Sequence, residues 1–155
     1  MTIRTTAKCK FFVGTTKSAS ALADYTADTW TEVTPVENLG EFGAEGASVV
    51  FKAISDGYAR KLKGTIDSGD IQLVCARDPA DAGQIALRAA ATSLFSYNFK
   101  VMLNDQSTAN GATPTIYYFS GPVMSAKNSL GAGDDVTKTT FKISISGQIL
   151  EVPAT

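Results

Sequence analysis

The residues that could carry chemistry in this chain form few groups with the spacing that a reaction or a ligand needs. Gly14-Thr15-Thr16-Lys17-Ser18 resembles a phosphate-binding loop, but it lacks the glycine directly before Lys17 and the earlier glycine of that motif. Asp134-Asp135 and Asp67-Ser68-Gly69-Asp70 could offer carboxylates to Ca²⁺, yet neither has the spacing of a calcium loop. Both fit turns in which an aspartate accepts from its own backbone. The sequence therefore predicts no cofactor and no metal site.

Histidine is absent from all 155 residues. It is the commonest general base and the commonest metal ligand, so its absence removes most catalytic triads and nearly all zinc sites. A hydrolase with paired carboxylates stays open, since 15 acidic residues allow many spatial pairs, but no pair stands out. We therefore predict that the protein is not an enzyme.

Composition and charge fit one globular domain, expected to span residues 1–155. The net charge of −1 lacks the basic excess typical of a sequence-specific nucleic-acid binder. The chain has neither a membrane-length apolar run nor a signal-peptide run at its start, which predicts folding in a cytosol and no membrane partner. Cys9 and Cys75 lie in apolar strand patterns and are expected to be free and buried. A disulfide would need adjacent strands and an oxidising compartment.

Short stretches of alternating apolar and polar residues predict about eight or nine strands. The alternation is clearest in Tyr97–Leu103 and in Asp135–Gly147. Short linkers favour antiparallel pairing, so we expect a mainly β fold: an antiparallel β-barrel or sandwich with one flanking α-helix. The other expected strands are Lys8–Gly14, Ser48–Ile54, Tyr58–Ile66, Asp70–Ala76, Thr115–Ser120, Val123–Ala126 and a last short one, Gln148–Val152. Pro35 is expected to keep Trp30–Leu39 at a sheet edge or out of regular pairing.

The spacing of apolar residues changes once from the alternation of a strand to that of a helix, and this change predicts a helix at Ala80–Leu94. Asp78 is the expected N-cap, Pro79 suits the first turn, and Asp81 adds a carboxylate near the positive end of the helix dipole. One face of this helix would carry mostly small residues and pack closely on a sheet: Gly83, Leu87, Ala90 and Leu94.

Aromatic residues are expected mainly in the core. Tyr117, Tyr118 and Phe119 could stack on bases or sugars, but a run of this kind in a strand more often has its inward members buried. Tyr118 would then be left at a surface. Trp30 is expected to anchor the core beside the long loop 15–28, which has at most one helical turn around residues 21–25.

Several short segments follow one another in a characteristic order between residues 8 and 152. They include TEVTPVENLG at 31–40, GTIDSGD at 64–70, DPADAGQIALRAAA at 78–91, YFSGPVMS at 118–125 and DVTKTTFKISISG at 135–147. In this order and spacing the chain resembles the lambda-type major tail tube protein of long-tailed phages. Some relatives carry a C-terminal immunoglobulin-like domain, which this chain is expected to lack.

The resemblance implies a structural subunit that forms hexameric rings, and these rings stack into a hollow tube through which DNA passes without specific binding. It also implies tape-measure, tail-tip and tail-terminator proteins as partners, assembly in the host cytoplasm, and a final place in the virion tail. A polar or acidic channel wall would keep DNA from adhering. The alternative is a soluble β-barrel or sandwich that binds a small ligand, which predicts a monomer with one enclosed pocket.

A predicted hairpin is the expected joint of such an assembly. Ser48–Ile54 and Tyr58–Ile66 flank an Asp-Gly pair, which favours a type I′ turn. Three consecutive apolar residues put apolar groups on both faces of the first strand, which suits burial on both sides. We predict a subunit or ring-to-ring contact here, with a hairpin inside the monomer core as the alternative. The contact residues would be Val49, Val50, Phe51, Ser55, Asp56, Gly57 and Tyr58.

Overall fold

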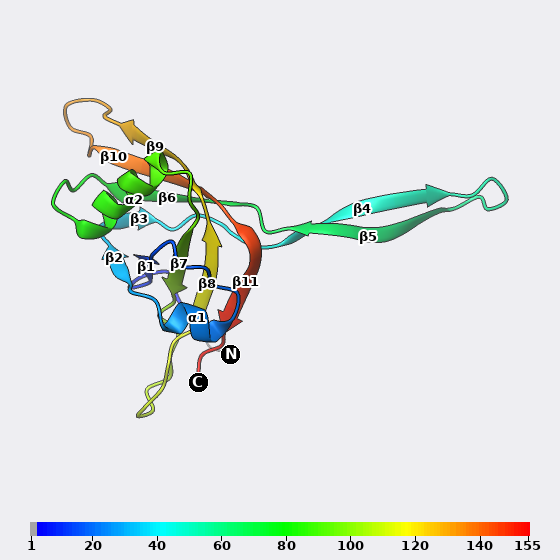
Figure 1. The fold of residues 1–155 in the computed structure, drawn as a ribbon, viewed down its shortest axis with the longest axis horizontal. Helices are drawn as coiled ribbons and strands as arrows, with labels where there is room; N and C mark the ends of the chain where they lie inside the picture. The colour runs from blue at the N-terminus through cyan, green and yellow to red at the C-terminus, as the bar shows by residue number, and fades with distance from the viewer. Residues whose placement is uncertain (1–2) are drawn as a thin grey trace.

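The fold consists of two packed antiparallel sheets and one separate hairpin (Figure 1). The computed structural model describes residues 3–155. Met1 and Thr2, which begin the N-terminal segment in which no signal peptide is expected, lie outside the described residues. One sheet has the strand order β11-β8-β7-β1-β2 and the other β3-β6-β10-β9, while β4 and β5 pair with each other. The strands are β1 (Lys10–Val13), β2 (Thr31–Val33), β3 (Val36–Asn38), β4 (Glu45–Lys52), β5 (Ala59–Asp67), β6 (Asp70–Ala76), β7 (Tyr97–Met102), β8 (Ile116–Gly121), β9 (Val123–Ser129), β10 (Lys138–Ser144) and β11 (Ser146–Val152).

The core fills the space between the two sheets. The predicted alternation in β7 is confirmed, since Phe99 and Val101 are buried whereas Lys100 points to the other face. Each such burial contributes about 1.5–3 kcal/mol of transfer free energy. No backbone pairing joins the two sheets among residues 3–155, so the mainly β fold is a sandwich rather than a barrel. The largest fully buried side chains include Phe11, Phe99, Phe119, Phe141, Ile71, Leu73 and Ile143.

The flanking helix α2 (Ala82–Thr92) packs on β1, β2 and β9, so it covers one margin of the sandwich. Its N-cap is Asp81, which accepts from the Gln84 N–H at 2.9 Å and from Thr34 N–H at 3.1 Å. The predicted cap Asp78 was wrong, because its carboxylate instead closes a turn by accepting from Ala80 N–H at 2.9 Å. The helix also ends before Leu94, which is fully exposed rather than on the buried face.

A second helix, α1 (Leu22–Thr26), lies on the outer face of the five-stranded sheet (Figure 1). Its Tyr25 stacks on Tyr118 with 5.4 Å between ring centroids, and Trp30 flanks the same ring at 5.9 Å. Trp30 is half-buried and donates from its indole N–H to the Tyr25 carbonyl at 3.1 Å. The prediction that Tyr118 stays at a surface was wrong: α1 covers it, and only 5% of it is exposed.

Both cysteines are free, as predicted. Cys75 is fully buried in β6, whereas Cys9 is only half-buried before β1. Burial raises the pKa of the Cys75 thiol to about 12, helped by the negative charge of Asp81, so the thiol stays protonated at neutral pH. A protonated, enclosed thiol acts here as a small apolar core residue.

The chain passes between the two sheets at two adjacent points. β8 gives way to β9 at Gly121-Pro122, and β10 gives way to β11 around Ile145. The predicted single strand 135–147 is therefore divided: Ile145 donates its N–H to the Gly69 carbonyl at 2.9 Å and turns the chain toward the other sheet. A Cβ at Gly121 would overlap the Ser144 carbonyl oxygen, so only glycine fits between these two crossings.

We expect Gly121→Ala to destabilise the sandwich, because the added methyl would push apart the backbones at the two crossings. Overpacking of this kind costs about 1–3 kcal/mol, which would lower the thermal unfolding midpoint by several degrees. Gly133→Ala is the matched control, since a Cβ at Gly133 meets nothing within 4 Å. Equal midpoints for the two variants would contradict the close approach.

The base of the loop between β7 and β8 depends on one carboxylate. Asp105 accepts from Thr115 N–H at 2.7 Å and from the Thr115 hydroxyl. These two hydrogen bonds lower the pKa of Asp105 from its ordinary value of 3.8. The Thr115 hydroxyl oxygen also accepts from Ala154 N–H at 3.2 Å, so the same point holds the last residues of the chain.

We expect Asp105→Ala to lower the unfolding midpoint at neutral pH. Because the folded-state pKa of Asp105 is depressed, its contribution is present above pH 3.8 and is lost as the pH falls through the folded-state value. The difference between the native chain and the variant should therefore vanish in a thermal unfolding series at low pH. Asp134→Ala, which removes a carboxylate from another exposed loop, is the matched control and should leave the unfolding midpoint at neutral pH close to that of the native chain.

Candidate assembly surface

The hairpin β4–β5 lies outside the body of the protein. Figure 1 shows it extending away from both sheets, and β4 and β5 pair only with each other among residues 3–155. Its apolar side chains are not in the core: Val49, Phe51 and Leu62 are 50%, 59% and 64% exposed. An isolated two-stranded ribbon is marginally stable in water. The hairpin therefore presents an apolar surface that the body of the same chain does not cover.

The strand register separates the hairpin into two chemically different faces. Val49 lies opposite Leu62, and Phe51 lies opposite Arg60, so these side chains share one face, here called the apolar face. The other face, here called the basic face, is dominated by three lysines and has two apolar side chains, those of Val50 and Ala59. Its cross-strand pairs are Ser48 with Lys63, Val50 with Lys61 and Lys52 with Ala59. Both faces of β4 carry apolar groups, as expected, but the register adds that the face with Val50 also carries the lysines.

The tip of the hairpin, residues 53–58, is organised by Asp56. Its Oδ1 accepts from Tyr58 N–H at 3.2 Å, and its Oδ2 accepts from the Arg60 guanidinium at 3.0 Å. The hairpin was predicted correctly, but the type I′ turn was not, since Gly57 has no positive φ. Tyr58 is 83% exposed, so the tip presents an aromatic ring to the solvent.

A groove of about 880 Å³ opens where the hairpin joins the sandwich. Phe42 meets Tyr117 edge-on, with 5.2 Å between ring centroids, and the Tyr117 hydroxyl donates to Glu151 at 3.3 Å. Burial, together with the negative charge of Glu151, raises the pKa of Tyr117, so its hydroxyl stays protonated. The walls, here called the base groove, are formed chiefly by Phe42, Ile66, Leu103, Tyr117, Ile149 and Glu151. The groove runs beside β11, which pairs only with β8.

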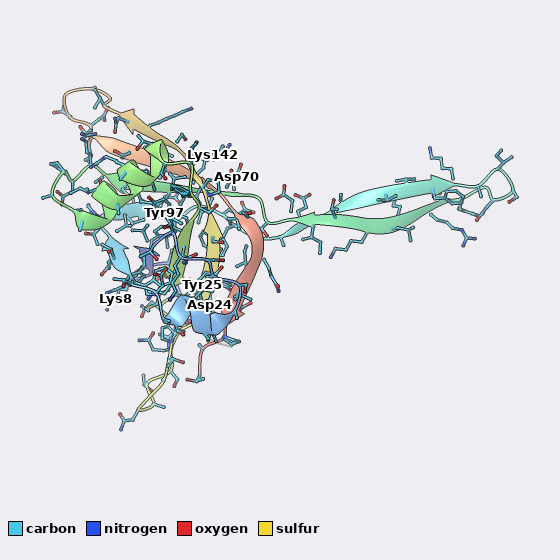
Figure 2. The ribbon with its side chains drawn as sticks, in the orientation of Figure 1. Lys8, Asp24, Tyr25, Asp70, Tyr97 and Lys142 are labelled. Carbon is cyan, nitrogen blue, oxygen red and sulfur yellow. The ribbon has the colours of Figure 1, made fainter. Side chains whose placement is uncertain are left out.

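The outer face of the four-stranded sheet carries polar side chains from its inner strand β10, namely Lys138, Thr140, Lys142 and Ser144. Helix α2 packs mainly on β9, β2 and β1. Figure 2 shows Asp70 and Lys142 together on this sheet, where the ammonium lies 3.2 Å from the carboxylate. A hydrogen bond from Ser144, together with Lys142, lowers the pKa of Asp70. Lys138 likewise pairs with Glu37 at 2.8 Å. These pairs offset the charges of Lys138 and Lys142, and Lys127 on the same face adds one further positive charge.

The segments that could have held ligands have structural roles. In the phosphate-loop-like segment, the N–H and hydroxyl of Thr15 donate to Asp28 at 3.1 and 2.6 Å, so a carboxylate takes the place of an anion. Asp67 and Asp135 each accept from a nearby backbone N–H within a turn. Within residues 3–155, no group of three metal-ligating side chains occurs, and no helix has the length and apolarity to span a bilayer.

We expect the double variant Phe51→Ser/Leu62→Ser to keep the unfolding midpoint of the native chain. Both side chains are exposed and contribute little to the body, so the change in free energy of unfolding should stay within about 0.5 kcal/mol. Phe99→Ala is the control, because removing a fully buried ring costs about 3–5 kcal/mol. Thermal unfolding followed by circular dichroism measures both. A comparable loss in the two variants would place the hairpin in the core.

No family model and no curated protein matches the sequence. Among solved structures, a chain described as the sheath/tube terminator of the PVC extracellular contractile injection system has a TM-score of 0.69 at 11% identity and covers 98% of both chains. A chain of the anti-feeding prophage (AFP) baseplate, 6-fold symmetrised, has a TM-score of 0.69 at 11% identity, over 99% of this chain and 98% of that one. The SPP1 tail tube has a TM-score of 0.62 at 13% identity, over 92% of this chain and 75% of that one.

At these identities the likeness concerns the fold. It supports the resemblance to tail tube proteins in a coarser form, because the matched structures come from contractile machines as well as from the SPP1 tail. Their descriptions name a sheath/tube terminator, a tail tube and a baseplate. The chain therefore has a tail-tube-like fold, an antiparallel sandwich from which one long hairpin projects.

Proposed function

We propose that this chain, as one domain spanning residues 1–155, is a structural subunit of a phage tail tube of the lambda type. Its copies form hexameric rings that stack into a hollow tube through which DNA passes. The observation that carries this proposal is the projecting hairpin, whose apolar face stays exposed in the isolated chain. The tail-tube-like fold supports it, and the ordered sequence segments support the lambda-type assignment.

A ring needs a contact between two different surfaces of the same chain. The hairpin and the body are such surfaces, and a head-to-tail contact between them closes into a ring when the rotation permits. A second contact with an axial rise stacks the rings. The residues predicted for these contacts remain Val49, Val50, Phe51, Ser55, Asp56, Gly57 and Tyr58, and all of them belong to the hairpin or its tip.

The outer face of the four-stranded sheet is the proposed channel wall. Copies of this sheet placed side by side would form a barrel with far more than the eight strands whose interior side chains can fill, and so leave a channel. The outer face of the other sheet is covered in part by α1 and does not suit this role. A wall whose charges are largely paired would let DNA pass without the phosphate contacts that produce tight binding.

Assembly would take place in the host cytoplasm, and the finished tube would belong to the virion tail. Tape-measure, tail-tip and tail-terminator proteins are the proposed partners. A soluble ligand-binding module is the weaker candidate. Its only support is the base groove, which is open along β11 rather than enclosed. That function would also leave the exposed hairpin without a role.

Deleting Asp56 and Gly57 should abolish tubes while leaving the monomer folded. The deletion removes the carboxylate that joins Tyr58 and Arg60, so the tip loses its shape. Size-exclusion chromatography and negative-stain microscopy compare the variant with the native chain, and circular dichroism confirms that both are folded. Rings or tubes of the native chain and their loss in the variant support the proposal; unchanged tubes would refute the role of the tip.

A further inference from the structure

Charge is divided along the length of the hairpin. Its outer part, residues 48–63, contains Lys52, Arg60, Lys61 and Lys63 but only one acidic residue, Asp56. Its attachment to the body is acidic, with Glu45 and Asp67 in the strands and Glu41 just before them. A further carboxylate, that of Glu151, lies on the wall of the base groove. The hairpin is thus a basic arm that grows from an acidic base.

Most of these charges have no ionic partner in the part of their own chain that the structure describes. Among the salt bridges of residues 3–155, only Arg60 of the arm takes part, and its partner is Asp56 at the tip. Glu41, Glu45 and Asp67 form none. Glu45 and Asp67 even lie directly opposite each other in the strand register. Like charges in that position destabilise a strand pair, so a cation supplied from outside would relieve the repulsion.

The arm and the base groove are also complementary in their apolar side chains. The arm presents Val49, Phe51 and Leu62, each at least half exposed. The base groove presents Phe42, Ile66 and further apolar walls, and its volume of about 880 Å³ accommodates several side chains. Burial of both surfaces would remove exposed apolar area from water, which is favourable by about 25 cal/mol for each Å².

The arm of a chain cannot bind in the base groove of the same chain. The arm points away from the body (Figure 1), and an eight-residue strand such as β4 is about 26 Å long at 3.3 Å per residue. The outer part of the arm therefore lies far from the base groove of its own chain. A second copy can bring its arm to this groove, and it leaves its own groove for a third.

We infer that the arm of one copy binds in the base groove of the next. The apolar face packs on Phe42 and Ile66, while the lysines of the basic face lie beside Glu41 and Glu45. This inference rests on the proposed tube subunit and identifies the receiving surface, which that proposal leaves open. The contact joins different surfaces, so it propagates from copy to copy.

Charge reversal tests this pairing directly. Lys61→Glu/Lys63→Glu should raise the protein concentration needed for assembly by about tenfold or more, because like charges across an interface oppose docking. Adding Glu41→Lys/Glu45→Lys in the same chain should restore assembly, since the signs are then exchanged on both surfaces. Lys8→Glu/Lys17→Glu is the control with the same change in net charge, and it should assemble as the native chain does. All six reversed residues, including those of the control, are exposed, so circular dichroism should show folded proteins.

Cysteine cross-linking gives a second, independent measurement. One chain carries Leu62→Cys and another carries Ile149→Cys, and the two are mixed under oxidising conditions. We expect a disulfide-linked heterodimer in the mixture and much less product from either chain alone. Two results would overturn the inference and leave the tube proposal intact: tubes that form without this cross-linked product, or normal assembly of the Lys61→Glu/Lys63→Glu variant. A native chain that forms neither tubes nor linked species refutes the tube proposal itself.

Nucleic acid is the other class of partner that a basic face could bind. If Lys61→Glu/Lys63→Glu removes DNA retention in a filter-binding assay but leaves assembly unchanged, the basic face serves DNA and the inference is wrong. If the variant loses assembly and the native chain retains no DNA, the second copy is the partner.

Discussion

A two-stranded ribbon cannot bury its own side chains, and this constraint governs how the molecule is organised. Each residue of β4 and β5 points to one of two faces, and neither face has a second layer within the chain. The sandwich, by contrast, places the side chains of two sheets against each other and completely encloses Phe11, Phe99, Phe119 and Phe141. The chain thus combines a body that is complete by itself with an arm that is complete only in contact with another surface.

The outer faces of the two sheets of the body differ in the side chains and elements that lie on them. The Tyr25–Tyr118 stack fixes α1 on the five-stranded sheet, and Lys100 lies 4.2 Å from the centre of the Phe12 ring on the same face. Partial burial lowers the pKa of Lys100, as expected for an ammonium held among aromatic rings. Both sheets carry ion pairs on their outer faces, Lys10 with Glu32 on the five-stranded sheet and Lys138 with Glu37 and Lys142 with Asp70 on the four-stranded one. The five-stranded sheet is therefore covered in part by its own chain through α1 and its aromatic contacts.

Local patterns in the sequence predicted the elements whose cause is local. The period of two in Tyr97–Leu103 identified the buried face of β7, because strand side chains alternate. The predictions were wrong where contacts between residues far apart in the sequence determine the local structure. Asp78 and Asp81 are both good caps, and the contact with Thr34 selects the second. Tyr118 is covered by a helix some 90 residues away, and three consecutive apolar residues concealed the two faces of the hairpin, which only the pairing with β5 defines.

The distribution of charge also limits which contacts an exposed arm can make. Unpaired strand edges tend to pair with one another, and proteins often block this with lysine. Two arms placed side by side would bring their lysines together, so arm-to-arm pairing is disfavoured by repulsion. An acidic surface beside an apolar groove has the opposite property: it attracts the arm and offers its apolar face a place to bind. Repulsion between two arms and attraction between an arm and a base groove both favour a contact between different surfaces. A ring or a tube needs such a directional contact.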